Sequence, residues 1–514
     1  MNTTHSNTGI AACDKVDQEQ LKALGYAAKF DRTMSVWQNF ALGFTYLSPV
    51  CGVYAMFAFG LSTGGPPMVW SYVIAGVGQL LVAVIFGEIV SQFPITGGLY
   101  PWSRRLVGKR WAWMAGWIYG WALFTTVAAV AVGAGPFLTV LLGTHSTPML
   151  TAILALALIL VSTVINLAGT KLLARVAMFG FICEIVGAIA VGAYIILFHR
   201  YHPLTVLFDR FGIGAGGSYL PAFMAAVLVG AYSCYGFEAC GDVAEETAQP
   251  GRTIPKAMCM TIYIGGGASL FIALALVLGV PDVPAVIAGR ETDPIMTILK
   301  SSFGPVGAYF VVGVVLVSFL SNVLSIQAAV SRLLYAYARD EMIVGSQLLS
   351  RLSPRTHIPE PALILSGIIP ATIVCLGYFT ENTLTTIVSF CTAGIYIAFQ
   401  MVVAAALYAR SRGWKPRGSF TLGRFGLLTN FAALAYGIAS IVNILWPRGS
   451  ESNWYNHYSL VLTVCVFVGS GVLYMVLGTP YEKGTSPAGD AWRSVPPDLG
   501  RAISADTPLP RSTG

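Results

Sequence analysis

The sequence alternates between long apolar stretches and short polar segments. Twelve apolar stretches of 18 to 32 residues can be marked, at 36–60, 67–91, 111–142, 149–167, 175–198, 219–241, 257–280, 305–336, 361–378, 384–409, 425–446 and 457–477. A helix of about 20 apolar residues crosses the roughly 30 Å hydrocarbon core of a bilayer. The pattern therefore predicts an all-α integral membrane protein with twelve transmembrane helices.

The polar segments are too short to form a separate domain. The longest are an N-terminal tail at 1–35 and a C-terminal tail at 478–514. The C-terminal tail is rich in Pro, Gly and Ser, a composition typical of disorder, and we expect it to be disordered in the cytoplasm. These lengths argue against a sensor kinase or a transporter with a fused nucleotidase, and the chain contains no G-x-x-x-x-G-K-[ST] pattern.

Composition strengthens the membrane interpretation. Charged residues make up 10% of the chain, the apolar set makes up 55%, and the mean hydropathy is +0.70. Soluble domains carry about 25% charged residues. These values exclude a cytosolic enzyme, a secreted disulfide scaffold, a disordered chain and a nucleic-acid binder. The 9 cysteines form no C-x-x-C pair, and the 6 histidines lie in tails, loops or span ends, so no metal or other cofactor site is expected.

The positive charges predict the orientation. If the N-terminal tail is cytoplasmic, 25 of the 30 Lys and Arg residues lie in segments on the cytoplasmic side and 5 on the outer side. Lys and Arg are enriched in the cytoplasmic loops of membrane proteins. We therefore expect a multi-pass protein of the plasma membrane with both tails in the cytoplasm.

Two of the predicted spans contain helix-breaking residues near their middle. The first span contains Ser48-Pro49-Val50-Cys51-Gly52, and the sixth contains Tyr232, Tyr235 and Gly236-Phe237-Glu238. Proline removes a backbone donor, and glycine loosens a helix. Taken singly, each could be a simple kink or a close-packing glycine. Together they fall at matching positions of two five-span halves, 36–198 and 219–409, which is the pattern of inverted-repeat transporters whose broken helices bind substrate.

Three acids lie within the predicted spans, where charges are costly and often functional. Glu88 lies near Arg104 and Arg105 in the sequence, and a structural cap or ion pair is expected for it. Glu184 and Glu238 lie near mid-membrane, where each could carry a coupled proton. Glu184 could instead hold a cation, and Glu238 could be a protonated acid satisfied by freed backbone groups. We favour Glu184 for coupling because we expect it to lie at a distance from the substrate.

Two of the predicted spans carry a stripe of polar or aromatic residues at helical spacing. Ser318, Asn322 and Ser325 share one face of the eighth span and could line a cavity or join helices by hydrogen bonds. Trp113, Trp117 and Trp121 share one face of the third span, and we interpret them as packing residues.

Four stretches resemble the amino acid–polyamine–organocation (APC) superfamily of permeases. They are Glu88 to Tyr100 with Pro94 and Gly97-Gly98, Asn166-x-x-Gly169-x-Lys171, Gly236-x-Glu238 continuing into Glu245-Glu246-Thr247 and Pro250 to Pro255, and Ser331-Arg332 continuing into Ala338-Arg339-Asp340. The resemblance covers roughly residues 36–480. The Glu-Glu-Thr variant is most similar to the amino acid/choline and γ-aminobutyrate permease branch.

The resemblance implies a leucine-transporter-like core of ten helices in a 5+5 inverted repeat at 36–409, followed by helices 11 and 12 at 425–477. It also implies a symporter that imports an amino acid or related amine by alternating access, with a coupling proton and no cofactor. The substrate carboxylate would bind amides of Ser48 to Gly52, although Pro49 supplies no N–H and an amine without a carboxylate remains an alternative. Tyr232 matches an aromatic gate, Gly236 to Glu238 match the unwound sixth span, and Asn322 would line the cavity. In some relatives a buried lysine stands where this chain has Glu184.

Other classes of function receive less support from the sequence. A membrane-embedded enzyme would need a nucleophile, base or metal set. The chain contains no H-E-x-x-H, and no predicted span carries both His and Asp, so we expect no enzyme activity. A choline, polyamine or γ-aminobutyrate transporter or exchanger remains an alternative, as does a channel or receptor. The sequence does not indicate an oligomeric state.

Overall fold

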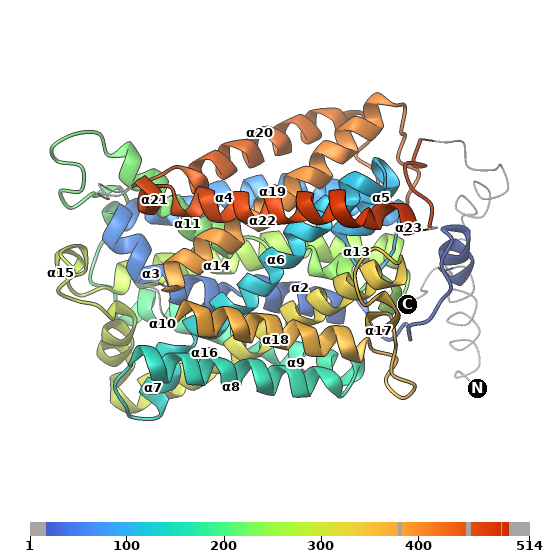
Figure 1. Ribbon diagram of the computed structural model, residues 1–514. Helices are drawn as coiled ribbons and strands as arrows, with labels where there is room; N and C mark the ends of the chain where they lie inside the picture. Colours follow the sequence, from blue (N-terminus) through green and yellow to red (C-terminus); the bar gives the residue numbers. More distant parts are fainter. Residues whose placement is uncertain (1–16, 379–382, 449–453, 485, 493–514) are drawn as a thin grey trace, which may run out of the picture.

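The computed structural model describes residues 17–378, 383–448, 454–484 and 486–492. Every regular element in these ranges is a helix (Figure 1). The longer helices are α2 (Val36–Leu47), α3 (Pro49–Gly64), α4 (Trp70–Gln92), α6 (Lys109–Gly133), α8 (Pro148–Leu167), α9 (Thr170–Ile185), α10 (Val191–Phe198), α11 (Leu220–Ser233), α13 (Pro250–Met260), α14 (Gly267–Gly279), α16 (Pro294–Arg339), α18 (Glu360–Gly377), α19 (Thr383–Ser411), α20 (Gly426–Leu445) and α22 (Ser459–Gly478). The shorter ones include α5 (Leu99–Leu106), α7 (Gly135–Leu141), α12 (Ala239–Asp242), α15 (Val283–Ile287), α17 (Ser346–Leu349), α21 (Trp454–His457) and α23 (Pro480–Lys483).

Eleven helical spans within the described residues are long and apolar enough to cross a membrane. The one predicted span without a counterpart among these eleven, the sixth at 219–241, is not a single helix. It consists of α11, a non-helical stretch at 234–238 and the short α12. The first span is also interrupted, because Ser48 adopts a left-handed conformation (φ 45°) between α2 and α3. Both predicted interruptions are therefore present.

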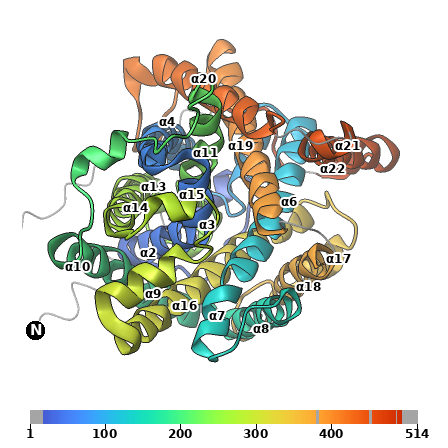
Figure 2. The same ribbon diagram turned by 90° about the vertical axis from the view of Figure 1, so that its left-hand side faces the viewer.

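The interrupted helices lie in the interior of the bundle. Figure 2 looks along the bundle and shows α2 and α3 inside, with α8, α20 and α22 at the periphery. In the most apolar stretch of Val36–Gly64, 94% of residues are buried, against 6% in Ser459–Gly478. The peripheral helices expose apolar side chains, as helices that face lipid must.

Further irregularities occur in three other spans. A π-helical turn, Val186–Ala190, separates α9 from α10, and a second one, Thr261–Gly266, separates α13 from α14. α16 consists of two helices that meet at Gly304, whose φ is 69°. Pro305 follows this junction, and its missing N–H and fixed φ suit the start of the second helix. The predicted span 305–336 thus corresponds to the second part of α16.

One end of the bundle carries α5, α17 and α23, and the opposite end carries α15 and α21 (Figure 1). The first end also holds the buried ion pairs Arg104–Asp340, Arg332–Glu246 and Arg339–Glu245. It corresponds to the cytoplasmic side of the predicted orientation, and we use that term for it below.

The disorder expected for the whole C-terminal tail does not hold for its first part. Residues 480–483 form α23, the N–H of Gly489 donates to the carbonyl of Arg104 (2.9 Å), and Asp490 pairs with Arg105 (3.2 Å). Composition alone predicted a solvated segment, but the charges of α5 provide partners for it. The remainder, 493–514, lies outside the described residues, as does 1–16 of the N-terminal tail.

Candidate functional site

A small cavity lies where the two interrupted helices meet. Its lining consists of Tyr46, Leu47, Cys51, Gly52, Thr126, Val130, Tyr232, Tyr235 and Asn322. These residues come from α2, α3, α6, α16 and the end of α11 with the stretch that follows it. Five of the eleven binding residues predicted from the sequence therefore line the cavity, and the other six lie in the adjoining stretches 48–50 and 236–238.

The two interruptions are in direct contact. Gly236 has a φ of 111°, and a Cβ atom there would lie 2.6 Å from the backbone nitrogen of Leu47. On the other side of the cavity, a Cβ atom on Gly52 would lie 2.7 Å from the hydroxyl of Ser233. A larger residue at either glycine would force the two segments apart.

Tyrosine rings close the cavity. Tyr235 makes edge-to-face contacts with Tyr46 and Tyr232, with ring centroids 6.2 and 5.9 Å apart. All three rings are buried. Such rings can exclude water and attract a cation to their faces.

The N-terminal turn of α3 already holds a carboxylate. The hydroxyl of Ser48 donates to Oε1 of Glu184 (2.5 Å), and the N–H of Val50 donates to Oε2 of the same side chain (3.2 Å). The N–H of Cys51 donates to the Ser48 hydroxyl (3.2 Å), and Pro49 has no N–H. Of the amides expected to bind a substrate carboxylate, that of Val50 is thus occupied by Glu184, which is fully buried, and those of Ser48, Cys51 and Gly52 donate to other groups of α2 and α3.

Glu184 lies against the predicted substrate segment rather than at a distance from it. The sequence interpretation expected it to lie at a distance from the substrate, where its protonation would shift helix packing without competing for the amine. Packing of α9 against α2 brings the two segments together: a Cβ atom on Gly180, one turn before Glu184, would lie 3.4 Å from Thr45. The N-terminus of α3 is the positive end of its helix dipole, which favours a negative charge on Glu184 at this position.

The carbonyl end of α2 is held by α16. Nδ2 of Asn322 donates to the carbonyl of Tyr46 (2.9 Å), and the hydroxyls of Thr45 and Ser325 lie 2.8 Å apart. Oδ1 of Asn322 is buried and has no hydrogen-bond partner. The polar face of α16 therefore both joins helices and presents a free acceptor at the cavity.

Glu238 lies behind the cavity, in the stretch between α11 and α12. Its Oε2 accepts a hydrogen bond from the N–H of Gly236 (2.9 Å), and Tyr119 of α6 donates to its Oε1 at 3.5 Å. Backbone groups freed by the interruption thus hold this acid, as one of the two sequence interpretations expected. No group of three or more His, Cys, Asp or Glu side chains that could hold a metal ion occurs among the described residues.

Comparison with known proteins identifies the family. The model of the amino acid permease family matches residues 34–468. The chain belongs to the amino acid permease family. It is 25% identical to amino-acid permease BAT1 of Arabidopsis thaliana over 84% of this chain and 88% of that protein. It is 27% identical to the BAT1 homolog of Oryza sativa subsp. japonica (81% and 85%) and 24% identical to amino-acid permease 2 of Neurospora crassa (94% and 91%). The resemblance to APC superfamily permeases is therefore confirmed.

In this permease the motifs of distant segments bind one another on the cytoplasmic side of the cavity. Glu246 binds Arg332 through both carboxylate oxygens, and Thr170 donates to the same carboxylate (2.6 Å). Glu245 pairs with Arg339 (2.8 Å) and accepts a hydrogen bond from the N–H of Thr96. These contacts explain why the motifs contain matched acids and bases.

The N-terminal segment adds to this closure. The N–H of Met34 donates to the carbonyl of Glu246, and the N–H of Ala248 donates back to the carbonyl of Met34. Asn39 of α2 donates to the hydroxyl of Thr247 and to the carbonyl of Cys240, both at 3.0 Å. The first helix of the permease is therefore bound to the loop that follows α12.

Glu88 has the structural role that the sequence suggested, but with a different partner. Glu88 does form an ion pair, but with Arg410 of α19 and not with Arg104 or Arg105. Its other oxygen accepts a hydrogen bond from the N–H of Leu422 (2.8 Å). Nearness in the sequence suggested the wrong arginines, because α5 turns away and Arg104 binds Asp340.

The tryptophan stripe is a packing surface, as predicted. Trp117 stacks on both Trp113 and Tyr474 of α22. Trp113 also contacts Tyr474 at a tilt, and Trp121 contacts Phe467 of the same helix. Nε1 of Trp117 also donates to the carbonyl of Phe467 (3.0 Å). The stripe attaches α22 to the core of the permease.

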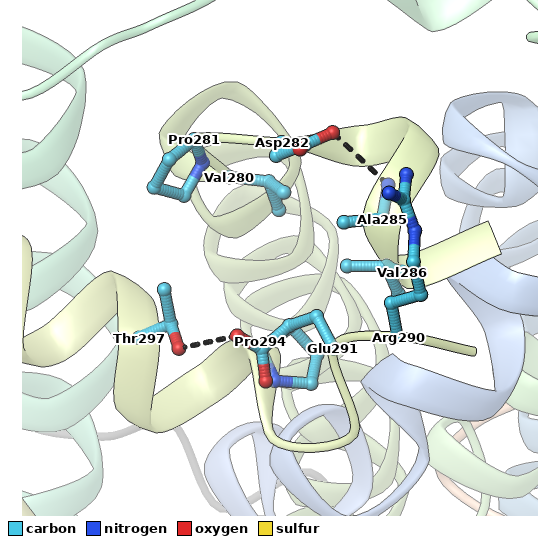
Figure 3. Close-up of a pocket in the computed structure, with 9 residues that line it drawn as sticks. All are labelled: Val280, Pro281, Asp282, Ala285, Val286, Arg290, Glu291, Pro294 and Thr297. Atoms are coloured by element: carbon cyan, nitrogen blue, oxygen red, sulfur yellow. Dashed lines mark hydrogen bonds between the residues drawn. The ribbon is translucent and has the colours of Figure 1, made fainter. Parts of the chain in front are cut away.

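A second pocket lies at the opposite end of the permease, around α15 (Figure 3). Asp282 caps α15 through the N–H of Ala285, and Glu291 accepts a hydrogen bond from Thr297 (2.9 Å). Both acids are therefore occupied by the loop's own groups. The loop itself packs on α3, so it covers the outer end of the interrupted first span.

The sequence interpretation missed several residues of this region. Tyr46, Leu47, Thr126 and Val130 line the cavity. Tyr119 binds Glu238, and Asp242 accepts a hydrogen bond from Tyr119 at 3.0 Å. Asp242 stands one residue beyond the predicted sixth span, and that boundary concealed it. The sequence signal that could have identified Asp242 is its spacing of four residues from Glu238.

Proposed function

We propose that this permease imports an amino acid or a related amine across the plasma membrane by alternating access, driven by a proton. The observation that supports this most directly is the bond of Glu184 to Ser48 and Val50. A titratable group then sits on the segment that would bind substrate. Both tails would be cytoplasmic, and 36–198 and 219–409 would form the inverted repeats.

The geometry suggests how the proton and the substrate are coupled. While Glu184 is ionised, it occupies the N-terminal turn of α3. A proton on Glu184 removes the negative charge and weakens its hold on Ser48 and Val50. The carboxylate of an incoming amino acid can then take these donors, while Oδ1 of Asn322 and the tyrosine rings receive its ammonium group. Protonation would thus precede substrate binding.

An amine without a carboxylate is the second candidate, and the same geometry supports it. Such a substrate would leave Glu184 in place and use only the tyrosine rings and the Asn322 acceptor. Choline and polyamines have no carboxylate and differ in this respect from α-amino acids and γ-aminobutyrate. An exchanger would use the same site without net proton movement, and a channel or receptor would not concentrate the substrate.

Uptake into sealed proteoliposomes tests the proposal. Acid outside should drive concentrative uptake without sodium, and competition among α-amino acids, γ-aminobutyrate, choline and polyamines should identify the substrate. Glu184→Gln keeps size and hydrogen bonding but cannot release a proton. This variant should still exchange substrate yet lose its acceleration by the gradient. Sodium-dependent uptake that remains gradient-driven in both Glu184→Gln and Glu238→Gln would defeat proton coupling at these sites.

A further inference from the structure

Two buried acids lie one helical turn apart on the cytoplasmic side of the cavity. Glu238 precedes α12 and Asp242 ends it, and both side chains are fully buried. Tyr119 of α6 reaches both, at 3.5 Å to Oε1 of Glu238 and 3.0 Å to Oδ2 of Asp242. Among the described residues, neither acid forms an ion pair, whereas Glu88, Glu245, Glu246 and Asp340 do.

The surroundings of the pair provide little compensation for two negative charges. The groups that face it are Tyr46 from α2, Tyr119 from α6, Cys240 from α12 and Arg332 from α16. Cys391 of α19 lies beyond Tyr46. Arg332 is already bound through two hydrogen bonds to Glu246. No cation is therefore dedicated to the pair.

Two oxygen atoms at the pair lack a hydrogen-bond partner. Oδ1 of Asp242 is buried and unpartnered, and it faces Gly98, where a Cβ atom would lie 2.4 Å away. The hydroxyl of Tyr46 faces Glu238 from α2 but is also buried without a hydrogen bond of regular geometry. A buried carboxylate oxygen without a donor is costly. A proton on the acid removes its negative charge and so lowers that cost.

The single hydroxyl proton of Tyr119 sharpens the argument. A tyrosine hydroxyl donates one hydrogen bond and accepts others. It can therefore stabilise only one of the two carboxylates when both are ionised. If one acid is protonated, that acid can donate to the Tyr119 oxygen while Tyr119 donates to the other acid. Two nearby carboxyls in such a setting titrate as a pair that holds one proton between them.

We propose that Glu238 and Asp242 form a single proton-binding pair bridged by Tyr119, placed between the cavity and the cytoplasmic closure. The proton would reach Glu238 from the cavity side past Tyr46, pass through the Tyr119 hydroxyl to Asp242, and leave toward the segment 243–247. No covalent bond other than O–H changes in this transfer. The inference rests on the proposed proton-coupled transport, and it adds an exit site that is separate from Glu184.

Asp242→Asn in proteoliposomes tests the pair. At fixed external pH, wild-type uptake should accelerate as the internal pH is raised, because release of the proton becomes easier. Asp242→Asn should lose this dependence on internal pH, with a rate ratio close to one, while substrate affinity changes less than about twofold. Glu291→Gln makes the same carboxyl-to-amide change in the outer pocket, and it should keep the wild-type response. An Asp242→Asn variant with the wild-type response would overturn the pair.

Two further measurements remove the remaining ambiguities. If Asp242→Asn fails to fold, as judged by gel filtration and melting, Tyr119→Phe should show a reduced response to internal pH, and an unchanged response would contradict the bridge. Infrared difference spectra of the purified protein at neutral pH should show a protonated carboxyl that disappears in the Glu238→Gln, Asp242→Asn double variant. If wild-type uptake depends on neither internal nor external pH, proton coupling itself is refuted. If the uptake of both wild type and Asp242→Asn depends on internal pH, only the proposed pair is refuted.

Discussion

The guanidinium of Arg332 and the carboxylate of Glu246 meet edge to edge, with Nε to Oε1 at 2.8 Å and Nη2 to Oε2 at 3.1 Å. Both side chains are only 1% exposed. The pair joins α16 to the loop after α12, on the cytoplasmic side of the cavity. A paired arrangement of this kind is among the strongest contacts between side chains, so we expect it to hold the two segments together.

Arg332→Ala should therefore favour a conformation that is open to the cytoplasm. Removing one partner of a buried ion pair costs about 3–5 kcal/mol, and about 1.4 kcal/mol already changes an equilibrium tenfold. The assay uses a protein whose native cysteines have been replaced and which carries Ala244→Cys at a buried position. Labelling of this cysteine by a maleimide added on the cytoplasmic side should rise at least about tenfold when Arg332→Ala is also present. Arg424→Ala, at an exposed position, provides the control. Equal labelling in the two variants would show that the pair does not hold the closure.

Gly236→Ala should damage the cavity even though it adds one methyl group. The added carbon would lie 2.6 Å from the nitrogen of Leu47, at a φ of 111° that side chains rarely adopt. We expect substrate binding to fall at least about tenfold, and Gly236→Leu to abolish it while the protein still reaches the membrane. Gly216→Ala meets open space and serves as the control. Normal affinity in Gly236→Leu would refute a site built on the interrupted helices.

Cysteine labelling in intact cells tests the orientation. Cysteines introduced at the exposed positions Ser62 and Ser146 should react with an impermeant reagent from outside. A cysteine in the loop before α18 should react only after permeabilisation. Gln347 is the better position there, because it is exposed whereas Ser353 is buried. External labelling at Gln347 would reverse the predicted topology.

Shortening the C-terminal tail should reveal the contribution of its first part. Deletion after Lys483 removes the carbonyl of Gly484 from Lys109, the carbonyl of Ser486 from Arg104 and the carboxylate of Asp490 from Arg105. Hydrogen bonds to charged groups contribute about 1.5–3 kcal/mol each, so the melting temperature should fall by several degrees. Deletion after Trp492 leaves these contacts in place and should melt like the full chain. Identical melting of both truncations would show that the contacts contribute nothing.

Hydropathy and helix-breaking residues predicted the spans and the two interruptions because both depend on local sequence. They could not predict the partners of charged side chains, since these depend on packing between remote segments. Glu184 is 136 residues from Ser48, and Glu88 is 322 residues from Arg410. The position of Glu184 against α3 and the pairing of Asp242 with Glu238 around Tyr119 follow from helix packing that no periodicity records.

Because the C-terminal tail is synthesised last, the contacts of its described part form only at the end of synthesis. Arg104 is synthesised early, but the carbonyl of Ser486, to which it donates a hydrogen bond, emerges from the ribosome 382 residues later. Until then Arg104 can bind Asp340 but not the tail, and the surface around α5 stays incomplete. A chain whose translation stops within α22 would insert most of its helices yet leave this surface uncovered, and quality-control proteases could distinguish it from a finished chain.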